Sequence, residues 1–361
     1  MSNVAIVGAG KTGRGFLARL LRETPTEVGE IVFVDKNREL VDKLNQDGFY
    51  SIHFFGESRI PMRISGYRAF TWDDKGLEKA LDTCRTVLVS VGGQNLTEAG
   101  HSLKDHLKKT GYTIITAENA SHPAATLQKE LGNHYPISEG TVFCTTIERD
   151  GLNISSEDYP YFQFDADAVP GYMPESGHLR PVKGFADFLT RKLYTYNAAS
   201  CVIAYLGAVK GYSDYGEAAN DPEIVEKLDR NYAATNKVLC KEYGYDEEDQ
   251  AEFALLSRKK FLDRTITDTV ARNARDPQRK LAAGERIMGP LMLIRKYGGD
   301  SSVLEETAAA ALLYEDPSDP VWTKLKEDQG PEGILREVCG LKETDGAWKA
   351  IILLKAKMQG R

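Results

Sequence analysis

The sequence predicts an N-terminal α/β domain with a doubly wound, mostly parallel sheet, followed by an all-α domain. In the first half of the chain, short apolar runs typical of buried parallel strands alternate with helical segments. After about Pro181, helical periodicity dominates and strand-like runs disappear. Two domains also suit a chain of 361 residues, since a domain has roughly 150 residues. The expected domains are 1–183 and 184–361.

The first domain is expected to contain strands joined by helices. The apolar run 4–7, which a glycine-rich turn follows, predicts the first buried strand. Strands that are separated by helices indicate β-α-β units, in which neighbouring strands run parallel. The other expected strands are 31–34, 86–91 and 113–116, with β-rich pieces over 50–64, and the expected helices are 16–21 and 39–45.

The second domain is expected to be helical from Phe185 onward. Asp221 is a good N-cap residue, and the proline after it suits the first helical position. This pair predicts a helix that runs to Tyr243 and ends at Gly244, since glycine is favoured just beyond a helix C-terminus. Further helices are expected over 281–297, 302–314 and 345–358.

Composition excludes several classes of protein. The formal net charge of −7 argues against general binding to nucleic acid or to an anionic membrane. Five widely spaced cysteines without a C-x-x-C pair favour reduced thiols over a zinc site or a disulfide framework. No apolar stretch reaches the ~18 residues that span a bilayer, and no signal peptide is evident. We therefore expect a cytoplasmic, metal-free monomer or homodimer.

A glycine motif follows the first predicted strand. Residues 8–13 read G-A-G-K-T-G, which is the G-x-G-x-x-G pattern, and they open a helix. Asp35 ends the second strand, 22 residues after Gly13. This context is typical of a Rossmann domain, in which the helix N-terminus faces a pyrophosphate. The expected cofactor contacts are Gly8, Ala9, Gly10, Lys11, Thr12, Gly13, Asp35, Val91 and Gly92.

Asp35 favours NAD over NADP as the cofactor. Its carboxylate would accept hydrogen bonds from the adenosine ribose hydroxyls and repel a 2′-phosphate. Lys36 and Arg38 follow closely and could soften this preference. A flavin, or a nucleotide bound without redox chemistry, remains an alternative at this point.

One segment carries a family resemblance. Residues 191–200 read R-K-L-Y-T-Y-N-A-A-S, which resembles the K-x-x-x-x-N-x-x-H signature of the polyol-specific long-chain dehydrogenases. Other similar segments occur in the family's order along nearly the whole chain. They are 8–16, 50–53 with 56–57, 117–119, 204–207, 275–281, 284–286 and Pro290. The resemblance implies an NAD-dependent oxidoreductase that interconverts a sugar alcohol or its phosphate and a ketose or ketose phosphate.

The resemblance also implies catalytic roles. Lys192 matches the family's general base, and Asn197 and Asn119 match amides that stabilise the alkoxide. The chemistry suits these residue types, because nonpolar surroundings lower a lysine pKa and neutral donors stabilise a developing oxyanion. On an ideal α-helix Lys192 and Asn197 would lie about 140° apart, a difference that the long lysine side chain would have to cover.

The substrate end of the predicted site departs from the family. Ser200 stands where the family has histidine, and serine is shorter and does not titrate near neutral pH. Arg275, Arg279 and Lys280 form a basic cluster that suits a phosphate, although a charged helix start or a domain interface would look the same. Glu148 is expected to relay a proton or to pair with Lys192.

Two other functions remain open from the sequence. The same scaffold could reduce a keto sugar acid or an opine-like compound, with the arginines binding a carboxylate. Alternatively, Ser200 could mark a non-catalytic, NAD-binding regulatory protein. Activity on keto acids alone would indicate the keto-acid reductase. NAD binding without hydride transfer would indicate the regulatory protein.

Overall fold

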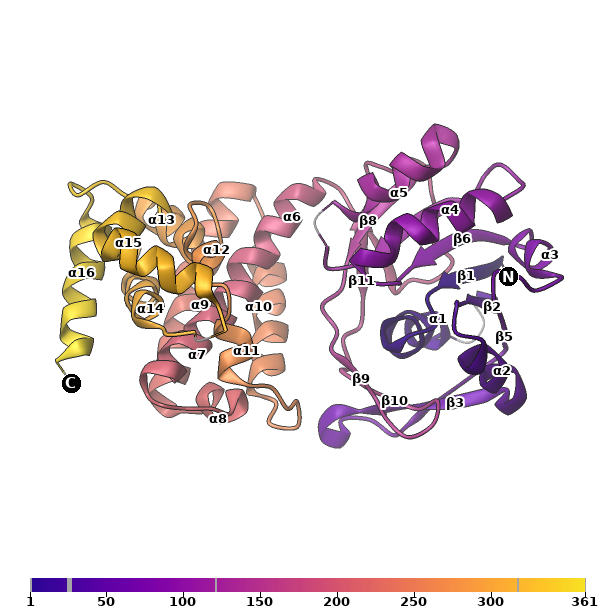
Figure 1. Cartoon of the computed structure of the whole chain (residues 1–361), viewed down its shortest axis with the longest axis horizontal. Coiled ribbons are helices and arrows are strands. Elements are labelled where there is room, and N and C mark those ends of the chain that lie inside the picture. The colour runs from indigo at the N-terminus through magenta and orange to yellow at the C-terminus, as the bar shows by residue number, and fades with distance from the viewer. Residues whose placement is uncertain (1, 25–27, 121, 317, 361) are drawn as a thin grey trace. The chain divides into compact units, whose positions relative to one another are not determined.

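The computed structural model describes residues 2–24, 28–120, 122–316 and 318–360. They form two compact units, Met1–Ala186 and Asp187–Arg361. Strands occur only in the first unit among these described residues, and the second is helical (Figure 1). The division lies three residues beyond the expected position at 183.

A large sheet organises the first unit. Its strand order is β12-β11-β8-β7-β6-β1-β2-β5, and all neighbours are parallel except β8 and β11. The order reverses direction at β1 and β6, which is where Rossmann sheets bind dinucleotides. The doubly wound sheet predicted from the sequence is therefore confirmed. The strands are β1 (Ser2–Val7), β2 (Val28–Val34), β5 (Tyr67–Phe70), β6 (Cys84–Val89), β7 (Thr113–Ala117), β8 (Ile137–Thr141), β11 (Phe162–Asp165) and β12 (Leu179–Val182).

Helices cover both faces of this sheet. One face packs against α3 (Leu77–Leu81), α4 (Leu96–His106) and α5 (Pro123–Leu131), which share a core with alternate residues of β1, β2 and β6. On the other face, Ile6 of β1 meets the turn at Gly13, just before α1 (Ala18–Arg22). Burial on both faces explains why β1 is a continuous apolar run. The π-helical turn η1 (Gly13–Leu17) leads into α1, and α2 (Arg38–Asp47) follows β2.

A second, smaller sheet has the order β4-β3-β10-β9. The β-rich region expected over 50–64 is the antiparallel pair of β3 and β4. This sheet packs on the start of the first helix through Gly15, where any side chain would collide with Ile154 of β10. The strands are β3 (Phe49–Phe54), β4 (Met62–Ser65), β9 (Thr146–Glu148) and β10 (Ile154–Ser156).

Local sequence signals explain α9 of the second unit. The Asp221 side chain accepts hydrogen bonds from the N–H groups of Glu223 and Ile224. Pro222 is the first helical residue, and Gly244 ends the helix with a φ of 71°. The predicted helix from Asp221 to Gly244 is confirmed. The helices are α6 (Phe185–Lys192), η5 (Leu193–Asn197), α7 (Ala198–Val209), α8 (Tyr215–Ala219), α9 (Pro222–Tyr243), α10 (Glu247–Leu262), α11 (Val270–Ala274), α12 (Pro277–Leu281), α13 (Met288–Lys296), α14 (Ser302–Leu313), α15 (Pro320–Glu337) and α16 (Gly346–Gln359).

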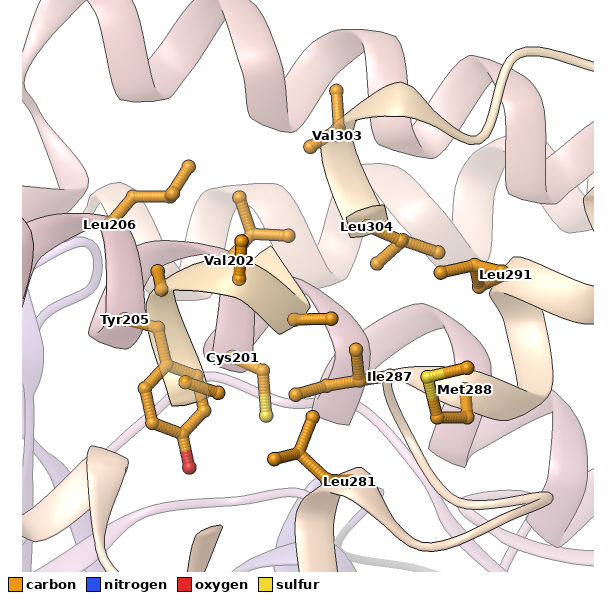
Figure 2. Close-up of a cluster of buried hydrophobic side chains, with 14 of the residues drawn as sticks. Cys201, Val202, Tyr205, Leu206, Leu281, Ile287, Met288, Leu291, Val303 and Leu304 are labelled. Atoms are coloured by element: carbon orange, nitrogen blue, oxygen red, sulfur yellow. The ribbon is translucent and has the colours of Figure 1, made fainter. Parts of the chain in front are cut away.

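Helix α7 is the centre of the helical unit. Residues 198–207 of this helix are buried apart from Ser200. An apolar surface on all sides is what a central core helix requires. In Figure 2, side chains of α7 meet those of α12, α13, α14 and the segment before α13. The labelled members are Cys201, Val202, Tyr205, Leu206, Leu281, Ile287, Met288, Leu291, Val303 and Leu304.

The helix expected over 281–297 is wrong in its first third. Helix α12 ends at Leu281, and α13 begins only at Met288. Gly284 has a φ of 79°, which a helix cannot contain. Leu281 and Ile287 are both fully buried, so their spacing imitated helical periodicity across a loop. This loop carries Arg286.

None of the helices within the described residues has the length and apolar character to cross a membrane.

Candidate functional site

Two glycines of the G-x-G-x-x-G motif are required by the packing around them. Gly8 follows β1 with a φ of 97°, and a Cβ there would collide with the Ser90 carbonyl oxygen beyond β6. A Cβ on Gly13 would collide with the Gly8 carbonyl oxygen. The first glycine thus makes the tight turn, and the last lets the helix approach the strand.

The middle glycine faces open space. A Cβ on Gly10 would meet no described atom within 4 Å. The Arg14 N–H donates to the Gly10 carbonyl oxygen at 2.9 Å, so the helix starts directly after Gly10. The N–H groups of Lys11 and Thr12 therefore belong to the first turn, where a helix offers no preceding carbonyl acceptor. The bare backbone and the helix N-terminus fit a pyrophosphate.

Arg14 holds this loop from inside the protein. Its side chain is 3% exposed and donates to the carbonyl oxygens of Ala9 and Leu152, each at 2.7 Å. Glu148 of β9 lies 3.5 Å from the same guanidinium and is 67% exposed. Burial lowers the pKa of Arg14. Glu148 thus has a partner within its own unit, and its pairing with Lys192 stays a prediction.

Replacing Arg14 with methionine is expected to loosen the nucleotide loop. The variant loses both hydrogen bonds to carbonyl groups, so the free energy of unfolding should fall by about 3 kcal/mol. The dissociation constant for NAD should rise, because Ala9 is no longer held. Thermal unfolding and NAD titration test this, with Arg85→Met as the control, since Arg85 is exposed on β6. Unchanged values in both measurements would show that the loop is held without Arg14.

Asp35 lies in a pocket beside the glycine loop. Its carboxylate accepts hydrogen bonds from the N–H groups of Ala9 at 2.7 Å and Asn37 at 2.9 Å. Each carboxylate oxygen can accept a further bond, so a ribose hydroxyl can still be bound. The pocket has a volume of about 160 Å³. Its lining combines apolar walls with Asp35 at one side, as an adenosine requires, and comprises Val7, Gly8, Gly10, Val34, Asp35, Lys36, Trp72, Ser90, Val91, Asn95, Glu98 and Ala99.

Glu118 organises the loop after β6. Its carboxylate accepts a hydrogen bond from the Gly92 N–H at 2.7 Å, and burial raises its pKa. Gly92 has a φ of 85°, which favours glycine. Asn119 follows Glu118 in the loop after β7 and is exposed. The predicted residues Val91, Gly92 and Asn119 therefore lie at the carboxyl ends of adjacent strands, where Rossmann sheets bind ligands.

In the helical unit, a π-helical turn begins after Lys192 and ends at Asn197. The Ala198 N–H donates to the Leu193 carbonyl oxygen, five residues earlier, and the turn covers Leu193–Asn197. A π-turn has more residues per turn than an α-helix, so residues five apart are rotated less relative to each other. The rotation between Lys192 and Asn197 is therefore smaller than the about 140° expected on an ideal α-helix.

The surroundings of Lys192 favour its neutral form. Burial, together with the positive charges of Lys260 and Arg286, lowers the pKa of Lys192 from 10.5 to about 7. A substantial share of the side chain is then neutral at physiological pH. A group that titrates near the working pH is the most effective general acid or base.

Ser200 belongs to a small polar network on the same helix. The Tyr215 hydroxyl donates to Ser200 Oγ at 3.2 Å, and Ser200 Oγ lies 3.5 Å from Asn273 Oδ1. The Lys280 ammonium donates to the Asn273 carbonyl oxygen. Lys280 is 5% exposed, and its pKa is lowered to about 8, mainly by burial. The structure thus joins the predicted residues Ser200 and Lys280 through Asn273.

The two predicted arginines, unlike Lys280, are exposed. Arg275 and Arg279 are exposed within the helical unit, and the Arg279 guanidinium pairs with Asp276. Only Lys280 of the basic cluster is buried, beside the Tyr205 ring at 5.8 Å. The substrate role of all three stays a prediction.

Sequence reasoning missed four residues around Lys192 and Ser200. Lys260 and Arg286 act on the pKa of Lys192, while Tyr215 and Asn273 bind Ser200. Arg286 lay within a segment of the family resemblance, so a signal existed for it. Nothing in the local sequence distinguished the other three. Across the described ranges, no group of three or more His, Cys, Asp or Glu side chains is placed to hold a metal ion.

Comparison with known proteins agrees with this architecture. Residues 185–357 match the family model described as "Mannitol dehydrogenase C-terminal domain". Two mannitol-1-phosphate 5-dehydrogenases are 28% identical to this chain over 96% of its length, from Bacillus pumilus (strain SAFR-032) and Bacillus subtilis (strain 168). The matches cover 97% and 98% of those proteins. The helical unit thus matches the mannitol dehydrogenase C-terminal domain, and the chain as a whole is similar to mannitol-1-phosphate 5-dehydrogenases.

Two solved structures have a similar fold. A substrate-free D-sorbitol dehydrogenase superposes with a TM-score of 0.78 at 15% identity, covering 99% of this chain and 93% of that one. The Pseudomonas fluorescens mannitol 2-dehydrogenase in a ternary complex with NAD and D-mannitol superposes with a TM-score of 0.64 at 15% identity. The match covers 99% of this chain and 91% of that one. Residues 4–164 also match the model "Ketopantoate reductase PanE/ApbA", which is consistent with the Rossmann unit.

Proposed function

We propose that the protein is an NAD-dependent dehydrogenase that interconverts a sugar alcohol phosphate and a ketose phosphate. The family and the names of its relatives support a polyol as the substrate class. The glycine loop and the Asp35 pocket support NAD. The observation that carries the proposal is Lys192, whose pKa of about 7 and position at the start of the π-turn that ends at Asn197 suit proton transfer to and from an alcohol.

The proposed chemistry uses the residues as follows. NAD held by the glycine loop and Asp35 would supply the hydride acceptor for oxidation, and NADH the hydride donor for reduction. Neutral Lys192 accepts the hydroxyl proton during oxidation, and protonated Lys192 returns it to the carbonyl oxygen during reduction. The Asn197 amide N–H donates to the oxygen as negative charge develops there. Asn119 is assigned the same donor role by the family resemblance.

A phosphorylated substrate is proposed from the positive charge of the helical unit. Arg286 acts electrostatically on both Lys192 and Lys280, so its positive charge lies near each of them. A dianionic substrate would stabilise such a cluster, and arginine forks suit phosphate oxygens. Arg275 and Arg279, exposed nearby in the sequence, are proposed as further phosphate contacts. Carboxylate recognition by the same cations is the competing possibility.

A screen of NADH oxidation tests the function. The substrates are ketose phosphates such as fructose 6-phosphate, free ketoses and keto sugar acids, with NADH binding measured in parallel. Turnover with ketose phosphates would support the proposal. Turnover with keto acids alone would assign the scaffold to that second class. NADH binding without any turnover would identify a regulatory protein instead.

Replacing Ser200 with histidine is expected to change substrate preference. Histidine reaches further than serine and offers a second ring nitrogen to a substrate hydroxyl. We expect kcat/KM for mannitol 1-phosphate to rise about tenfold, the value of one good hydrogen bond. Ser200→Ala is the control, because it also disturbs Tyr215 and Asn273 but adds no donor. An equal effect of both variants would exclude a direct role for position 200 in substrate recognition.

A further inference from the structure

Two cations follow Asp35, and the sequence left their effect on cofactor choice open. In Rossmann domains, an arginine near the end of the second strand accommodates the 2′-phosphate of NADP. Arg38 occupies such a position at the start of α2, and Lys36 lines the adenosine pocket. NADP binding therefore depends on whether these cations are available to a phosphate.

Arg38 is engaged by the turn after β5. Its Nη1 lies 2.8 Å from Asp74 Oδ1, and its Nη2 donates to Thr71 Oγ1. Asp74 also accepts the Thr71 N–H at 2.7 Å, so the turn holds the carboxylate in place. This hydrogen bond and Arg38 lower the pKa of Asp74, which stays ionised. Trp72, which lies between Thr71 and Asp74 in the sequence, lines the Asp35 pocket, so this turn borders the pocket.

Lys36 is engaged on the other side of the pocket. Its ammonium lies 3.0 Å from Glu98 Oε2 and 3.4 Å from Asn95 Oδ1, both on or next to α4. Among the charged residues that line the pocket, the carboxylates of Asp35 and Glu98 outnumber the one cation, Lys36. A 2′-phosphate would meet this excess negative charge without a free guanidinium to bind it.

We propose that Asp74 acts with Asp35 to exclude NADP, by keeping the Arg38 guanidinium from the 2′-phosphate. Arg38 is the stronger of the two potential phosphate ligands, because its planar fork binds phosphate through two parallel hydrogen bonds. Asp74 is therefore a specificity-determining residue, although it touches only Arg38 and the turn. The proposal concerns the NAD site alone and does not depend on which substrate is used.

Binding measurements on purified variants test the proposal without turnover. Asp35→Ser removes the direct repulsion, and Asp74→Asn is added to it. Asparagine keeps an oxygen for the Thr71 N–H but removes the charge that holds Arg38. The dissociation constants of NADPH, NADH and adenosine 2′,5′-bisphosphate are measured by fluorescence titration or calorimetry. The matched control adds Asp42→Asn instead, because Asp42 lies 3.9 Å from Arg38 on α2.

Adding Asp74→Asn to Asp35→Ser should lower the dissociation constants of NADPH and adenosine 2′,5′-bisphosphate about tenfold or more. The dissociation constant of NADH should change less than about threefold. Adding Arg38→Ala should abolish this gain. NADH binding and thermal unfolding confirm that each variant is folded, since an exposed ion pair contributes little stability. Equal NADPH affinity with and without Asp74→Asn would overturn the proposal. So would an equal gain from Asp42→Asn, or a gain that persists without Arg38.

Discussion

Replacing Lys192 with alanine is expected to lower kcat/KM for the alcohol by about 10²–10⁴-fold, the usual contribution of a general acid or base. NAD binding should stay unchanged, because the glycine loop and Asp35 belong to the other unit. Steady-state kinetics and NAD titration of the same preparation separate these effects. Lys259→Ala is the matched control, since Lys259 is an exposed neighbour of Lys260 on α10. Intact turnover in Lys192→Ala would reject Lys192 as the base.

The pKa of Lys192 also predicts how the rates of alcohol oxidation and ketose reduction depend on pH. Only neutral lysine accepts a proton, so alcohol oxidation should rise with pH and level off above about 7. Ketose reduction needs the protonated form and should fall above the same pH. Lys260→Gln removes a neighbouring positive charge, so the pKa of Lys192 and the inflection should move to higher pH. An inflection that stays in place would show that another group titrates.

The second large effect is expected at the glycine motif. Gly13→Ala places a methyl group against the Gly8 carbonyl oxygen, where the backbone cannot yield. The free energy of unfolding should fall by about 3 kcal/mol, in the range of severe overpacking. NAD binding should be lost with it. Denaturant unfolding of the cofactor-free protein measures the first effect, and calorimetry measures the second.

Gly10→Ala should separate folding from binding. A Cβ at Gly10 meets no described atom, so the melting temperature should stay at the wild-type value. The same methyl group occupies the space where the pyrophosphate approaches the backbone, so NAD affinity should fall at least about tenfold. Wild-type NAD affinity in Gly10→Ala would mean that the nucleotide binds elsewhere on the chain.

Much of the fold was predictable because its signals are local. The apolar runs at 4–7 and 113–116 became central strands, since burial on both faces imposes a continuous apolar sequence. Asp221 and Gly244 marked the two ends of α9 through capping preferences that each residue carries by itself. The prediction failed over 282–287, where Leu281 and Ile287 are buried from either side of a loop.

The candidate site likewise has a part that local sequence signals predict and a part that depends on the fold. The sequence by itself predicted the nucleotide loop and the place of Asp35, and it put Lys192 and Asn197 in one short segment, since these depend on residue type and close spacing. Only the tertiary structure decided the rest. Packing produced the π-turn, brought Lys260 and Arg286 to Lys192, and joined Arg38 to Asp74. Charges act through space, so no local pattern records which of them a fold brings together.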